Sequence, residues 1–147
     1  MKTITNSELR QSIARDLLMD EDNRIFVLDT RLAIPPLAWL TKTFAPICVR
    51  EFQKVPAVAD GWDCDDAARQ AQVLANRAHA KSGEASGLAF GWTAGTLTEP
   101  VNGMPAGPHA FNIVLCDETL YAFEPQNGRV TPLVDLGLSF LPQLVVV

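Results

Sequence analysis

The chain has 147 residues, of which 12 are Lys or Arg and 17 are Asp or Glu, so its formal net charge is −5 at pH 7. With 48% apolar and 20% charged residues it can build the core of one folded domain, which excludes a disordered chain. The acidic balance argues against nucleic-acid binding, and no run of about 18 apolar residues predicts a membrane span. Three cysteines and the absence of an apolar signal segment near residue 1 indicate a cytoplasmic protein with free thiols.

The first part of the chain, residues 1–60, is expected to form a helical and irregular cap. Thr5 and Glu8 have the spacing of a capping box, which predicts a helix that begins at this point. Three further segments are expected in the cap: extended chain at 24–28 and at 47–52, and a short apolar helix at 37–44.

The clearest helix covers residues 63–80. Small side chains recur at helical spacing along one side of it: Cys64, Ala68, Ala71, Ala75 and Ala78. Asp63 suits the N-cap, because its carboxylate can accept from unpaired backbone N–H groups of the first turn. A stripe of small residues predicts that this helix packs closely against its neighbour.

Beyond residue 87 the pattern changes to strands. Four strands are expected, at 88–92, 109–116, 119–123 and 129–133. A loop rich in Gly and Pro, 102–108, precedes the second of them. The apolar C-terminus, 144–147, is either the last strand of the sheet or a contact with another chain, and we favour the strand. We therefore expect a single α+β domain, 1–147, in which residues 61–147 form a helix packed on a mostly antiparallel sheet.

Cys64 is the candidate for a reactive side chain. In the first turn the helix dipole favours a thiolate by only about 0.3–1 kcal/mol, and the neighbouring aspartates oppose it, so a cationic partner is needed. His79 lies fifteen residues further along the same helix, roughly 22 Å away, which is too far. His109 begins a strand after the Gly/Pro loop and is the expected partner. Cys48 and Cys116 are expected to be buried core residues.

Glu124 is the candidate for a carboxylate that orients His109. If residues 117–118 form a two-residue hairpin loop, Cys116 pairs with Thr119, and counting outward brings Phe111 opposite Glu124. Glu124 is then a diagonal neighbour of His109 on the same face, within reach of its side chain. A four-residue loop gives the same pairing, whereas a three-residue loop would place Glu124 on the opposite face.

These residues resemble a known family. Residues 63–68 (Asp-Cys-Asp-Asp-Ala-Ala), 107–112 (Gly-Pro-His-Ala-Phe-Asn) and 123–128 (Phe-Glu-Pro-Gln-Asn-Gly) are similar to the three catalytic segments of papain-like and transglutaminase-like cysteine peptidases. The order Cys, His, Glu is most similar to that in the C-terminal protease domain of mushroom agglutinin-type chimerolectins. The resemblance covers about half of the chain, from Trp62 to Val130, and implies a papain-like fold.

The resemblance implies a cysteine hydrolase or acyl transferase acting on a peptide or on another amide or ester. Cys64 would be the nucleophile that forms a thioester, His109 the base and Glu124 the orienting acid. Candidates for the oxyanion hole or the cleft are Gln53, Trp62 and Asp63. No cofactor and no metal ligand are assigned, although the calcium dependence of the chimerolectin proteases implies that a divalent cation such as Ca²⁺ could bind.

Two other functions stay open at this point. The first is a non-catalytic binding or structural module of the same fold, such as a virion or phage component, and the apolar C-terminus would suit a homo-oligomer. The second is a metal-binding domain, because Asp63, Asp65 and Asp66 could bind a hard cation together with His109 or Glu124. Neither alternative involves nucleic acid or a membrane.

Overall fold

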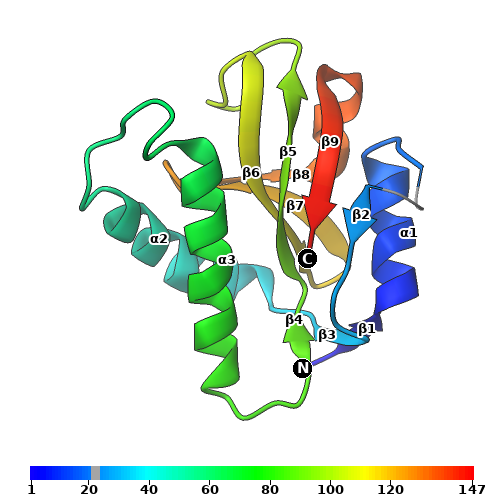
Figure 1. Ribbon diagram of the computed structural model, residues 1–147. Coiled ribbons are helices and arrows are strands. Elements are labelled where there is room, and N and C mark those ends of the chain that lie inside the picture. Colours follow the sequence, from blue (N-terminus) through cyan, green and yellow to red (C-terminus); the bar gives the residue numbers. More distant parts are fainter. Residues whose placement is uncertain (21–23) are drawn as a thin grey trace.

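The computed structural model of the chain describes residues 1–20 and 24–147, and its fold is α+β, as the sequence predicted. The described residues include a six-stranded sheet in the order β2-β9-β5-β6-β7-β8 (Figure 1). Its neighbouring strands are antiparallel, except that β2 and β9 are parallel. The strands are β2 (Ile25–Phe26), β5 (Phe90–Leu97), β6 (Gly107–Cys116), β7 (Thr119–Glu124), β8 (Arg129–Pro132) and β9 (Phe140–Val146). A smaller sheet contains β1 (Thr3–Thr5), β3 (Arg31–Ala33) and β4 (Gly87–Leu88).

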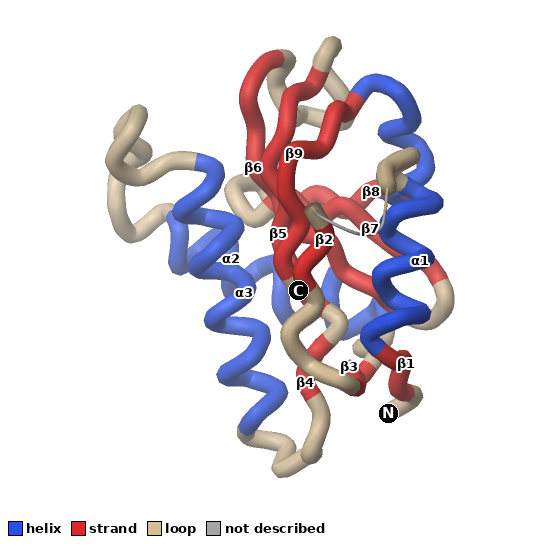
Figure 2. The backbone as a smooth tube through the Cα atoms, turned by 45° about the vertical axis from the view of Figure 1, so that its right-hand side comes forward, coloured by secondary structure: helices blue, strands red, loops and turns tan. Residues whose placement is uncertain are grey.

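Helices cover both faces of the larger sheet. They are α1 (Asn6–Asp16), the π-helix η1 (Trp39–Phe44), α2 (Ala45–Phe52), α3 (Cys64–Ala80) and the 3₁₀ segment η2 (Leu133–Ser139). Figure 2 shows α2 and α3 on one side of the strands and α1 on the other. Thr5 caps α1 through the predicted capping box, with the Glu8 N–H donating to its hydroxyl over 3.3 Å.

Two apolar clusters fill the space between these layers, and the alternation of side chains along β6 separates them. Phe111 and Ile113 point to the cluster beneath α1, where Leu9 and Ile13 are also fully buried. The intervening residues of β6 face the other cluster, which α3 and α2 cover; it contains Val114, Cys116, Phe44, Cys48, Ala71 and Ala75. Cys48 and Cys116 are thus buried, as predicted.

The structure corrects the expectation that residues 47–52 are extended. They belong to α2, which has Pro46 in its first turn and buries Ala45, Cys48 and Phe52. These three residues lie three and four positions apart, which is the helical period, and proline is tolerated in the first turn because its missing N–H has no partner there. The expected short helix at 37–44 is present as η1.

The apolar C-terminus is the strand β9, as favoured. It lies inside the sheet, paired with β5 on one side and with β2 on the other. The pairing with β5 runs along most of β9, whereas β2 pairs only with Val145 and Val146, so the apolar C-terminus is accounted for by the sheet and the expected homo-oligomer stays a prediction. No helix in the described part of the chain combines the length and the apolar character needed to cross a membrane.

Helix α3 packs on β5 and β6, as its small residues predicted. Ala68, Ala71 and Ala75 are buried, but Ala78 is exposed and His79 is buried instead. The fully buried Asn112 of β6 fixes the helix to the sheet, because its side-chain amide donates to the Ala68 carbonyl over 2.8 Å. This contact positions the start of α3 beside β5 and β6.

Candidate functional site

The site begins at the first turn of α3. Asp63 is the N-cap, in extended conformation, and its backbone N–H donates to the Asp66 carboxylate over 3.4 Å. The carboxylate of Asp63 in turn accepts a hydrogen bond from the Asp60 N–H over 3.2 Å. These bonds hold Cys64, the first residue of the helix, in a half-buried position at the surface of the sheet.

His109 and Glu124 form a buried pair on the neighbouring strands. Nε2 of His109 lies 2.6 Å from Oε2 of Glu124, and their side chains are 3% and 4% exposed. The register is the one predicted from the two-residue loop, with Cys116 opposite Thr119. The second oxygen of Glu124 accepts from the Gln126 N–H over 3.1 Å, which fixes the carboxylate at the end of β7.

The surroundings of His109 favour its protonated form. Burial alone would lower its pKa, but hydrogen bonds with Cys64 and Glu124 and the charge of Glu124 outweigh burial and raise the pKa to about 9. The structure therefore brings Cys64, His109 and Glu124 together, with a positive imidazolium between the sulfur and the carboxylate.

A pocket of about 260 Å³ opens over this group, and we call it the α3 pocket. It is lined by Asp63, Cys64, Asp65, Ala94, Gly95, Pro108, His109, Ala110 and Gln143. Of the remaining predicted site residues, Gln53 lies elsewhere, in a separate pocket with Asn127 and Gly128. Trp62 is a packing residue, since its ring stacks on Phe52 with centroids 5.4 Å apart and its Nε1 donates to the Phe52 carbonyl.

Gln143 and Gly95 are among the residues of the α3 pocket that were not singled out as site residues from the sequence. Gln143 comes from β9, and no motif surrounds it. Gly95 lies where the pairing of β5 with β9 shifts register, and a methyl group there would lie 2.4 Å from the Leu141 carbonyl oxygen. A glycine inside a strand pattern is the signal that could have indicated this close approach.

Three carboxylates lie beside the pocket mouth. Donor atoms of Asp63, Asp65 and Asp66 lie within 4.8 Å of one another, and Arg69 pairs with Asp65 at 2.6 Å and with Asp66 at 3.0 Å. A hydrogen bond between the side chains of Asp63 and Asp65 lowers the pKa of Asp63 and raises that of Asp65. The arginine already neutralises part of this charge, and the binding of a divalent cation stays a prediction.

Comparison with known proteins gives relatives by structure alone. No family model matches the chain, and no curated protein sequence matches it either. A structure described as the PSL1a–E64 complex superposes with a TM-score of 0.78 at 15% identity, over 99% of this chain and 50% of that one. Polyporus squamosus lectin bound to the human-type influenza-binding epitope Neu5Acα2-6Galβ1-4GlcNAc gives 0.76 at 16% identity, over 99% and 49%. The chain shares the fold of these proteins and spans about half of their length.

This likeness corrects the family and the activity expected from the motifs. One reported neighbour is a lectin bound to a glycan, and this finding contradicts the interpretation as a papain-like or transglutaminase-like cysteine peptidase. The same finding contradicts the expected hydrolase or acyl transferase with a peptide, amide or ester substrate. Each of the three motifs is short. Cys64, His109 and Glu124 meet because the capped start of α3 packs on the β6–β7 hairpin, which carries the buried His109–Glu124 pair.

Proposed function

We propose that this domain is a non-catalytic binding module that holds one sugar residue of a glycan in the α3 pocket. The observation that carries the proposal is the fold shared with Polyporus squamosus lectin along 99% of the chain. The glycan complex named for that lectin suggests the class of ligand, and the α3 pocket supplies suitable groups.

Sugar hydroxyls need directional hydrogen-bond partners, and the α3 pocket offers both kinds. The carboxylates of Asp63 and Asp65 accept hydrogen bonds, and the Gln143 side chain both donates and accepts. Hydrogen bonds to charged groups are stronger than neutral ones, so two carboxylates can hold adjacent hydroxyls firmly. The volume of about 260 Å³ lies just below the usual range for ligand pockets, which suits a ligand as small as a single sugar ring.

The charge around the pocket favours a neutral sugar. Asp63, Asp65 and Asp66 lie at one side, with Arg69 paired to two of them, and His109 is paired with Glu124 inside the sheet. An acidic sugar would bring its carboxylate close to like charges. We therefore expect Galβ1-4GlcNAc to bind more tightly than its sialylated form.

In this proposal His109 and Glu124 are framework residues. Their buried pair ties β6 to β7 and holds the imidazolium at the base of the pocket. Cys64 is a wall residue, and its sulfur takes no part in catalysis.

The test is isothermal titration calorimetry with Galβ1-4GlcNAc and with Neu5Acα2-6Galβ1-4GlcNAc. We expect Asp65→Asn to weaken the binding of the neutral disaccharide about tenfold, because it removes a charged acceptor. Asp135→Asn is the control, since that aspartate lies in η2, away from the α3 pocket. Cys64→Ser should leave affinity unchanged.

Two results would overturn the proposal. One is that neither glycan binds, or that Asp65→Asn and Asp135→Asn bind equally well. The other is turnover of an amide or ester by the native protein that Cys64→Ser abolishes, because a binding module has no such activity.

A further inference from the structure

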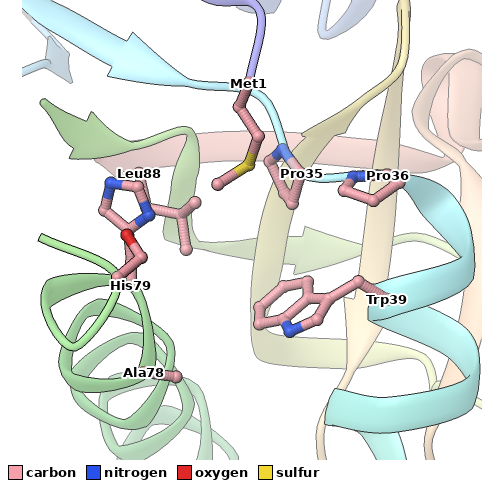
Figure 3. A pocket seen from close by; sticks show the side chains of 8 residues that line it. Met1, Pro35, Pro36, Trp39, Ala78, His79 and Leu88 are labelled. Atoms are coloured by element: carbon pink, nitrogen blue, oxygen red, sulfur yellow. The ribbon is translucent and has the colours of Figure 1, made fainter. Parts of the chain in front are cut away.

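A second cavity lies at the opposite end of α3 from the α3 pocket. It has a volume of about 370 Å³, and we call it the Trp39 cavity. The last turns of α3 and the strand β4 form one wall, and the chain leading into η1 forms the other (Figure 3). Its walls include Pro35, Pro36, Trp39, Ala78, His79 and Leu88.

The walls of the Trp39 cavity are suited to a flat apolar molecule. One face of Trp39 is already covered, because its ring stacks on Phe44 with centroids 4.8 Å apart and planes inclined by 19°. The half-buried indole also lines the cavity, where it can contact a second ring. Pro35 and the buried Leu88 supply apolar surface, and the two prolines make their wall rigid.

The imidazole of His79 is a polar group on this mostly apolar surface, which Ser82 also lines. Nε2 of His79 lies 3.0 Å from the Ser86 carbonyl oxygen. A carbonyl only accepts, so Nε2 carries a proton, and in the tautomer with this single proton Nδ1 is an acceptor. Among the described residues, Nδ1 has no hydrogen-bond partner. Figure 3 shows the His79 ring beside Leu88, across the cavity from Trp39.

We propose that the Trp39 cavity is a binding site for a small planar aromatic molecule that carries one hydrogen-bond donor, such as an indole or a phenol. The ring stacks on the free face of Trp39 between the proline wall and Leu88, and its N–H or O–H donates to Nδ1 of His79. The cavity volume lies within the usual range for small-molecule pockets. This inference does not depend on the glycan proposal, because the two sites lie at opposite ends of α3.

The test titrates the isotope-labelled protein with indole and with 1-methylindole and follows amide and indole N–H signals by NMR. We expect saturable shifts at Trp39 and His79, with a Kd of about 1 mM or tighter for indole. The binding of 1-methylindole should be roughly threefold to tenfold weaker, because it lacks the donor. Equal affinity for the two compounds, or shifts gathered elsewhere in the chain, would overturn the proposal.

Two exposed alanines in the last turns of α3 give a matched pair of variants. Ala78 lines the cavity, so Ala78→Phe fills it and should weaken indole binding at least tenfold. Ala80 is exposed and does not line the cavity, so Ala80→Phe should bind as the native protein does. His79→Leu should remove the preference for indole over 1-methylindole. If Ala78→Phe and Ala80→Phe bind indole equally well, the Trp39 cavity is not the site.

Discussion

The two ends of α3 differ in chemistry and in how the chain builds them. At its first turn the α3 pocket gathers carboxylates, an amide and an imidazolium from the helix, β6 and β9. At its last turns the Trp39 cavity gathers apolar side chains around one imidazole. Each histidine has a hydrogen-bonded oxygen partner, the Glu124 carboxylate for His109 and the Ser86 carbonyl for His79. The surroundings differ in effect: Cys64 and Glu124 together raise the pKa of His109, whereas the Ser86 carbonyl orients the His79 ring.

The largest effect should come from removing the partner of His109. Glu124→Ala leaves a buried imidazolium without its counter-ion, and we expect it to lower the free energy of unfolding by about 3–5 kcal/mol. Chemical denaturation measures this loss. Glu118→Ala, at the exposed loop of the same hairpin, is the control and should change stability by less than about 0.5 kcal/mol. Equal effects of the two variants would show that the His109–Glu124 pair does not support the sheet.

The next effect is a dependence of stability on pH. The pKa of His109 is raised from 6.5 to about 9, so the folded state binds the proton more tightly than the unfolded state. The resulting stabilisation is fully present below pH 6.5 and is lost as the pH rises towards 9, by on the order of 2–3 kcal/mol. Denaturant midpoints measured across this range should fall for the native protein. His109→Gln should have a flatter profile, and an equally steep one would contradict the assignment.

Gly95 tests how closely β9 approaches the α3 pocket. Gly95→Ala places a methyl group against the Leu141 carbonyl and the Phe140 ring, and we expect a loss of about 1–3 kcal/mol. Gly61→Ala is the matched control, because the methyl group there meets only ordinary contacts beyond 3.5 Å. Thermal unfolding of the two variants compares them. A Gly95→Ala protein as stable as Gly61→Ala would mean that β9 is not held so near.

The smallest effect concerns the three thiols. Burial raises the pKa of Cys48 and of Cys116 to about 12, so neither forms much thiolate in the folded protein. Cys64 is half-buried in the α3 pocket. We expect one thiol per folded chain to react with a disulfide reagent near pH 8, and none in Cys64→Ser. Mass spectrometry of the labelled chain identifies the residue, and early labelling of Cys48 or Cys116 would contradict the burial.

Local patterns in the sequence were sufficient to predict much of the α3 pocket. Small residues at helical spacing predicted α3, and the two-residue loop at 117–118 predicted the register that brings Glu124 to His109. Both depend on contacts between residues close in sequence or on the counting of a hairpin. The structure confirms these elements, but they did not predict the activity correctly. The same geometry also suits an ion pair that only supports the sheet.

Contacts between distant segments could not be predicted in this way. The insertion of β9 between β2 and β5, which brings Gln143 and Gly95 into the α3 pocket, depends on the pairing of strands that are not neighbours in sequence. The Trp39 cavity depends on η1 meeting the end of α3. The chemistry of each wall is visible in the sequence, but the meeting of the walls is a property of the whole fold.

The central claim is tested most directly by NMR mapping of a Galβ1-4GlcNAc titration on the native protein. The account predicts saturable shifts of Gly95, His109 and Gln143 around the α3 pocket, while Trp39 and His79 at the other end of the helix stay unchanged. Absence of shifts at the α3 pocket, or shifts confined to the Trp39 cavity, would contradict it.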